Sequence, residues 1–113
     1  MCFENIVAMH LDRTTGALQH RHEGDQASGI ATAEATGRTL SALAHLRAAR
    51  PTLAYGGLTV TAALTSVANY AIANLLQADG RAVDDVVIQT GARGRASDLA
   101  TQAVFAAGLL EAA

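Results

Sequence analysis

The longest stretch without a charged residue, residues 51–78, decides between two very different folds for this chain. Its length would suffice to cross a bilayer, which takes about 20 predominantly apolar residues. Polar or flexible residues interrupt it at Thr52, Gly56, Gly57, Thr59, Thr61, Thr65, Ser66, Asn69, Asn74 and Gln77. So many interruptions do not suit a membrane span, and we interpret the stretch as a buried strand followed by a buried helix. We therefore expect no membrane partner.

The size and the alanine content of the chain limit the core that it can build. Its 113 residues fit one domain, residues 1–113. Alanine accounts for 26 of them and only 4% are aromatic, so large side chains are few. Small domains bury a smaller share of their surface than large ones do. A homo-oligomer would compensate by covering more of that surface.

The charged residues and the single cysteine exclude several classes of function. The formal net charge is −2 and all the basic residues are arginines spread along the chain, so we expect no nucleic acid partner. The absence of lysine excludes Schiff-base and P-loop chemistry that depends on a lysine. Cys2 alone cannot form an internal disulfide, and the first residues lack the features of a signal peptide. The expected location is the cytoplasm.

Local patterns predict strands alternating with helices. The expected strands are residues 5–12, 17–23, 53–61 and 83–90, and the expected helices are residues 25–49, 62–78 and a last one that Ser97 or Asp98 caps. Gly16 can adopt a positive φ, so the first two strands look like a hairpin. Pro51 ends the first helix and Asp79-Gly80 the second. The order ββαβαβα predicts an α/β fold, with α+β as the alternative, in which helices pack on a small single-layer mixed sheet.

Small and apolar residues recur at helical spacing in the expected helices. In the first they are Ile30, Ala33, Gly37, Leu40 and Ala44, in the second they are Leu64, Val67, Ala68, Ala71, Leu75 and Ala78, and in the last they are Leu99, Ala103, Ala106 and Leu110. Ala33 and Gly37 have almost no side chain, so another backbone can approach closely at these positions. The helices are therefore expected to pack closely, across a boundary between subunits.

Three histidines, His10, His20 and His22, lie in the expected hairpin. Imidazoles at alternate positions of a strand and across the ladder suit zinc, copper or nickel, and Asp12 could add an oxygen ligand. The same imidazoles could transfer protons in catalysis. The alternative is that these histidines are solvated or bond to the backbone. Neither the cofactor nor an enzymatic reaction follows from the sequence.

The register of the hairpin decides whether these histidines meet. With a four-residue loop, Leu11 faces Leu18 and His10 points to the other side of the sheet. If Gly16 instead forms a bulge, the pairing shifts by one residue and His10 lies opposite His20. Only the second register places all three imidazoles on one face. Both registers remain open.

A loop rich in glycine and arginine connects the last expected strand to the last helix. The candidate ligand-binding residues are Gly91, Arg93, Gly94, Arg95 and Ser97 of this loop, together with Tyr55 beside a glycine pair. Backbone N–H groups at such a corner can hold a phosphate or carboxylate, and two guanidiniums would assist. The alternative is that the glycines only turn the chain while the arginines are solvated or pair with Asp84, Asp85 or Asp98.

Two stretches resemble parts of the RidA enamine/imine deaminases. Residues 11–18 are similar to a hairpin of that family, and residues 74–80 running into 84–87 are similar to its helix-to-strand corner. The resemblance implies a trimer of small α/β subunits with ligand sites between chains. In that family the two stretches lie close together, whereas a strand and a helix separate them here. The family's later segment with its substrate-binding arginine has no counterpart, so the resemblance assigns no functional residue.

Two functions are consistent with these observations. The first is a homo-oligomeric protein that binds a small anionic or phosphorylated metabolite at the glycine and arginine loop, with the histidines available for proton transfer. The second is a non-enzymatic interaction or assembly module that uses its alanine-rich helices and the edge of the hairpin. The partners expected are a second copy of the chain and, in the first case, a small anion.

Overall fold

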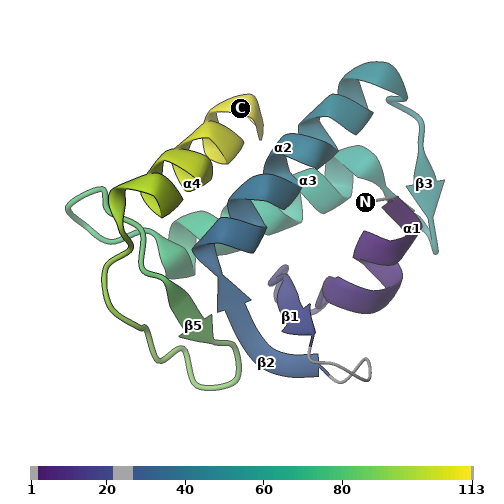
Figure 1. Ribbon diagram of the computed structural model, residues 1–113. Coiled ribbons are helices and arrows are strands. Elements are labelled where there is room, and N and C mark those ends of the chain that lie inside the picture. The colour runs from purple at the N-terminus through teal and green to yellow at the C-terminus, as the bar shows by residue number, and fades with distance from the viewer. Residues whose placement is uncertain (1–2, 22–26, 113) are drawn as a thin grey trace.

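The computed structural model describes residues 3–21 and 27–112 of the chain (Figure 1). The elements are α1 (Phe3–Asn5), the π-helical η1 (Ile6–His10), β1 (Gln19–Arg21), β2 (Ala27–Thr32), α2 (Ala33–Ala49), β3 (Ala54–Tyr55), β4 (Leu58–Thr59), α3 (Val60–Tyr70), the π-helical η2 (Ala71–Leu75), β5 (Asp85–Val87) and α4 (Leu99–Ala112). Helices pack on short strands, which confirms the α/β class. Within the described ranges, no helix is long and apolar enough to span a membrane.

The strands form two small antiparallel sheets. One has the order β1-β2-β5, and the other pairs β3 with β4. In the first sheet Ala31 pairs with Val86, and both are fully buried, whereas the neighbouring Val87 is 40% exposed. One side of this sheet therefore faces the core. The details differ from the single mixed sheet that the element order predicted, because β2 pairs directly with β5 and the chain between them does not enter this sheet.

The expected strand at residues 5–12 is wrong, because these residues are largely helical. Phe3, Ile6 and Val7 are buried, and their spacing of three and four residues suits a helix. Of the expected hairpin, residues 22 and 23 lie outside the described part of the chain, and the described residues retain one bridge, between Leu11 and Leu18. This is the pairing that a four-residue loop produces. The sequence thus predicted the turn correctly and the strand before it wrongly.

Gly16 completes this turn and fixes it against α3. Its φ is +87°, as the turn requires, and its N–H donates to the Asp12 carbonyl oxygen at 2.7 Å. The Asp12 N–H donates in turn to the Ala17 carbonyl oxygen at 2.8 Å. A Cβ atom at Gly16 would collide with Ser66 of α3. The turn therefore packs too closely on α3 to accept a larger residue.

The first long helix begins later than the sequence predicted. Residues 27–32 form β2, and the helix starts where the Thr32 Oγ1 accepts a hydrogen bond from the Ala35 N–H at 3.3 Å. The Ala33 N–H donates to the Asp84 carbonyl oxygen at 2.9 Å, which holds the helix start against the chain before β5. The end of α2 at Ala49 agrees with the prediction.

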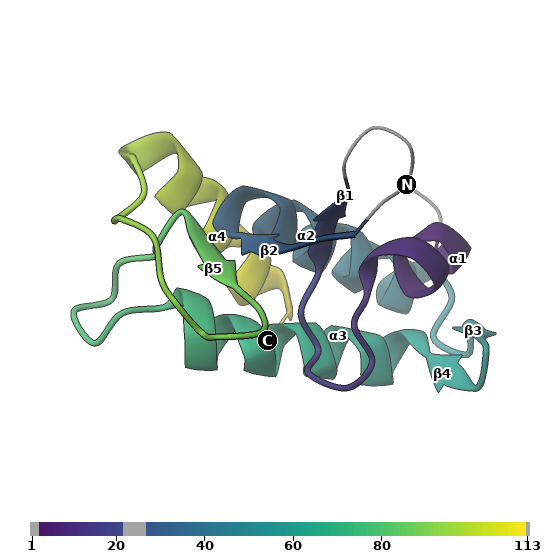
Figure 2. The ribbon, with the colours of Figure 1, turned by 90° about the horizontal axis from the view of Figure 1, so that it is seen from below.

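Helix α3 supplies much of the core on the side of the molecule opposite α2 and α4 (Figure 2). Of the apolar residues that the sequence predicted to line one face, Leu64, Val67, Ala71 and Leu75 are buried in α3 and η2, Ala68 is half-buried and Ala78 is exposed. The helix starts two residues earlier than expected, because Thr59 caps it. The helical segment ends at Leu75, and Gly80 adopts a φ of +88° in the turn that follows.

Helices α2 and α4 cross at a pair of glycines. A Cβ atom at Gly37 would collide with the backbone at Phe105, and one at Gly108 would collide with the carbonyl group of Gly37. The expected close approach at Gly37 is therefore confirmed. The backbone that approaches belongs to the same chain, however, so this face of α2 is already covered within one subunit.

Candidate functional site

The glycine and arginine loop does not present an open row of backbone donors. It folds back along β5, so that the Gly94 N–H donates to the Asp85 carbonyl oxygen at 2.9 Å and the Ser97 N–H donates to the Ala82 carbonyl oxygen at 3.0 Å. The loop N–H groups that donate within the chain are those of Gly91, Ala92, Gly94 and Ser97. These groups are not free to bind an anion in this conformation.

The polar side chains of the loop are bonded or buried within the fold, with the exception of Arg95. The Arg93 Nη2 donates to the Ala73 carbonyl oxygen at 3.0 Å, which ties the loop to η2. The hydroxyl of Ser97 is buried and has no hydrogen-bond partner, so a ligand in solvent cannot reach it. Arg95 is exposed, and its guanidinium has no partner in the part of the chain that the structure describes. One free arginine remains of the expected anion site.

Tyr55 lies far from this loop. It belongs to β3, which Figures 1 and 2 both show at the opposite end of the molecule from β5. Its side chain is 40% exposed. Tyr55 therefore does not join the glycine and arginine loop in one site.

The histidines do not share a hairpin. His10 ends η1, and its Nδ1 lies 3.2 Å from the Gln19 carbonyl oxygen, a contact with the backbone. The side chain of His20 and the whole of His22 lie outside the described part of the structure. Among the described residues, no three histidines, cysteines, aspartates or glutamates are grouped to hold a metal ion.

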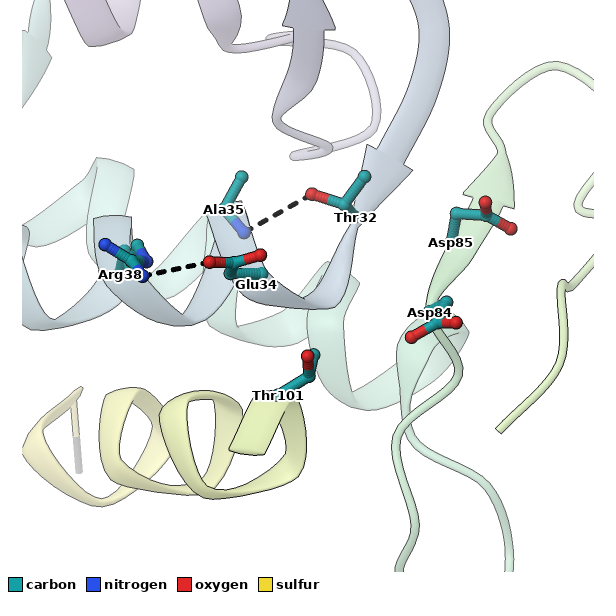
Figure 3. A pocket seen from close by; sticks show the side chains of 7 residues that line it. All are labelled: Thr32, Glu34, Ala35, Arg38, Asp84, Asp85 and Thr101. Atoms are coloured by element: carbon teal, nitrogen blue, oxygen red, sulfur yellow. Dashed lines mark hydrogen bonds and ion pairs between the residues drawn. The ribbon is translucent and has the colours of Figure 1, made fainter. Parts of the chain in front are cut away.

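A cleft of about 590 Å³ lies between β2, α2, β5 and α4 (Figure 3). Its charged side chains are Glu34, Arg38, Asp84 and Asp85. Figure 3 shows Glu34 and Arg38 on one side, joined by an ion pair of 2.9 Å, and the two aspartates on the other. Carboxylates outnumber arginine, so the cleft favours cations and disfavours the phosphate or carboxylate that the neighbouring loop was expected to bind.

Pairing between β2 and β5 brings the acidic residues of this cleft together. Thr32 is opposite Asp85, and Glu34 follows two residues after Thr32 in the first turn of α2. Glu34 was not among the predicted site residues, because residues 25–49 were expected to form one helix. A strand that ends at Thr32, followed by an acidic residue in the first helical turn, is the signal that would have revealed it.

Two ionisable groups close to these elements have altered proton affinities. Hydrogen bonds from the backbone and side chain of Thr101 lower the pKa of Asp98, which caps α4 with its Oδ1 2.8 Å from the Thr101 N. Burial raises the pKa of Tyr70, and the nearby Asp12 carboxylate raises it further. Both shifts favour the form that the group already has at neutral pH, so neither group is brought to titrate near pH 7.

The outer face of α4 is the least expected surface of the molecule. We define it by the four apolar residues that marked this helix in the sequence, Leu99, Ala103, Ala106 and Leu110. All four are exposed, Leu99 to 85% and Leu110 to 76%, while Phe105 and Gly108 turn toward α2. Helix α4 lies at the edge of the molecule (Figure 1). Its apolar spacing was recognised from the sequence, but those residues do not pack in the core.

Comparison with protein families, with curated proteins and with solved structures found no match. The resemblance of residues 11–18 and 74–87 to the RidA deaminases therefore gains no support. Only the surfaces of this chain therefore indicate a function.

Proposed function

We propose that the protein is an interaction module that assembles with another protein surface through the outer face of α4. The observation that carries this proposal is the exposure of Leu99 and Leu110 on one side of a single helix. Residues 99–110 contain no charged side chain, and only Thr101 and Gln102 among them are polar, so most of the surface of α4 is apolar. A helix of this kind is normally covered all round.

The free energy of burial favours a partner for this face. Covering a leucine side chain contributes about 1.5–3 kcal/mol, and Leu99 and Leu110 are almost wholly uncovered. Ala103 and Ala106 between them allow a partner to approach the backbone of α4 closely. Contiguous apolar surface on a small domain marks an interaction site more often than a scattered apolar residue does.

The other expected surfaces support the proposal less. Binding of an anion at residues 91–97 stays a prediction, and the committed N–H groups and the acidic cleft beside the loop do not favour it. The edge of the sheet offers little room for a docking strand, because β1 has three residues and residues 93–96 already bridge to the chain along β5.

The proposal is tested in extracts of cells that produce the tagged chain. We expect the native chain to elute from a sizing column above the position of its monomer, and the variant Leu99→Gln/Leu110→Gln to elute as the monomer. Ile72→Gln is the matched control, because Ile72 is 53% exposed on η2 and lies outside the α4 face. Identical elution of the native chain and the double variant would refute the proposal.

A further inference from the structure

The residues of the outer face of α4 have the same order and spacing in both directions along the helix. Leu99 and Leu110 stand at its ends, Ala103 and Ala106 stand between them, and the spacings are four, three and four residues. In an antiparallel pair of such helices, each leucine meets a leucine and each alanine meets an alanine. A surface that fits itself about a two-fold axis is what a symmetric dimer requires.

We infer that the partner of this face is a second copy of the chain, with the two α4 helices packed antiparallel. This inference rests on the proposed function and names its partner. Spacings of four and three residues place the side chains along one seam, as in paired helices. Alanines at the centre of the seam let the two helices approach closely, and leucines at both ends cover the remaining apolar surface.

The residues beside the seam are uncharged, so they cannot select a charged partner. They are Ala100, Gln102, Ala107 and Leu109. Flanking charges usually set the choice and direction of a partner in paired helices. Here two identical uncharged faces meet without leaving a charge unpaired. A basic or acidic partner surface would gain nothing from this face.

Charges at the two ends of α4 favour the antiparallel direction. Helices α2 and α4 start at one end of the molecule, where Glu34 and Asp98 line a common hollow. They also end together, where His45 and Glu111 lie 3.3 Å apart and Arg47 donates to a carbonyl oxygen in the last turn of α4 at 3.5 Å. The starting end is therefore acidic, whereas at the other end Arg47 and His45 accompany the single carboxylate of Glu111.

The balance at the starting end is clearly negative. Glu34, Asp84, Asp85 and Asp98 are accompanied there by Arg38 and Arg95. A parallel dimer would place two such negative ends side by side. An antiparallel dimer instead places each negative end beside the end of the other copy where Arg47 offsets Glu111. This arrangement avoids the repulsion between two negative ends.

A shallow apolar groove extends the surface at the far end of the seam. It has a volume of about 520 Å³ and is lined by Ala44, His45, Ala48, Ala49 and Glu111. Glu111 follows Leu110 directly, so the groove opens beside the end of the seam. The antiparallel arrangement brings Leu99 of the second copy to this end, where small side chains leave room for it.

The first measurement is the mass of the purified protein by light scattering and analytical ultracentrifugation. We expect the native chain to be a dimer that dissociates on dilution. Leu99→Gln/Leu110→Gln should weaken the dimer by about a hundredfold or more, while Ile72→Gln leaves it unchanged. Far-ultraviolet circular dichroism checks that both variants keep their helices. A native chain that stays monomeric at high concentration would overturn the inference.

The second measurement determines the direction of the helices by disulfide formation. Leu99→Cys and Leu110→Cys are prepared separately in a Cys2→Ser chain, then mixed. An antiparallel pair brings position 99 of one copy next to position 110 of the other, whereas like positions lie about 16 Å apart along the helix and cannot be bridged. We expect covalent dimers to form at least about tenfold faster in the mixture than in either variant alone. Equal or faster formation by either variant alone would overturn the antiparallel arrangement.

Failure of the inference can be told apart from failure of the proposed function. Complexes in cell extracts that require Leu99 and Leu110, together with a purified monomer, would retain the function and overturn the second copy as partner. A purified dimer that the double variant leaves intact would overturn the inference. If complexes in extracts also survive that variant, the proposed function fails with it.

Discussion

The two sides of α4 are equally apolar in sequence and yet have opposite surroundings. One side carries Phe105, which is 2% exposed, and Gly108, which touches the backbone of Gly37 in α2. The other side carries Leu99 and Leu110, which are mostly exposed. The side with the glycine packs inward because Gly108 lets the backbones of α2 and α4 come closer than a Cβ atom would allow. In a helix with apolar residues on both sides, local shape decides the orientation, and hydrophobic periodicity does not.

The largest expected effect is the difference in stability between two variants, one on each side of α4. Phe105→Ala removes a buried ring and should lower the free energy of unfolding by about 3–5 kcal/mol. Leu110→Ala removes an exposed side chain. It should change the free energy of unfolding of dilute, dissociated protein by less than about 0.5 kcal/mol. Urea unfolding measures both. Similar losses for the two variants would show that the outer side is not exposed in one subunit.

A second pair of variants uses the glycine contact and should have an intermediate effect. Glycine to alanine in an open helix stabilises by about 1 kcal/mol. At Gly37 the added methyl group meets the backbone of α4, so Gly37→Ala should instead destabilise by about 1–3 kcal/mol. The matched change on the outer face, Ala103→Gly, should lose only about 1 kcal/mol through helix propensity. A gain in stability for Gly37→Ala, again by urea unfolding, would contradict the close crossing.

The smallest expected effect concerns Asp98, which caps the first turn of α4. Hydrogen bonds from Thr101 favour ionised Asp98 and lower its pKa in the folded chain. The contribution of ionised Asp98 to stability is therefore present at pH values above its ordinary pKa of 3.8, and it is lost as the pH falls through the lowered pKa of the folded chain. Asp98→Asn keeps a capping oxygen but does not titrate. Acid titration followed by circular dichroism should show that the native chain loses its helix at a slightly higher pH than the Asp98→Asn variant does. Identical titration curves for the native chain and Asp98→Asn would argue against a stabilising role of ionised Asp98.

The parts of the fold that were predicted correctly have strong local signals. The spacing of Leu64, Val67, Ala71 and Leu75 allows only a helix, and Pro51 cannot continue one. Gly37 also indicated a close contact without any knowledge of its partner. In each case the residues that carry the signal are neighbours in sequence, so the chain needs no distant contact to determine the local structure.

The parts that were predicted wrongly depend on distant contacts. Residues 27–32 form a strand because Ile30 and Ala31 pair with Val87 and Val86, far along the chain. Residues 5–12 contain apolar residues that fit two periods, and only burial of Phe3, Ile6 and Val7 favours the helix. Short segments of this kind have no decisive period of their own.

The candidate sites show the same division. The apolar residues of α4 were recognised because their spacing is regular, although the sequence could not say which side they occupy. The acidic cleft was not recognised, because Glu34 and Asp85 meet only through the pairing of β2 with β5. Ligand binding by Arg93 stays a prediction, and its contact with the Ala73 carbonyl oxygen arises from the tertiary fold, which the sequence does not show.

The common starting end of α2 and α4 has a consequence for the electric field of the molecule. The aligned peptide dipoles of a helix place about half a positive charge at its first turn, and here two first turns lie at one cleft (Figure 3). Glu34 and Asp98 stand in or next to those turns and offset that charge. The positive ends of the two helices thus offset part of the negative charge of the carboxylates at this cleft, and this attraction stabilises the fold.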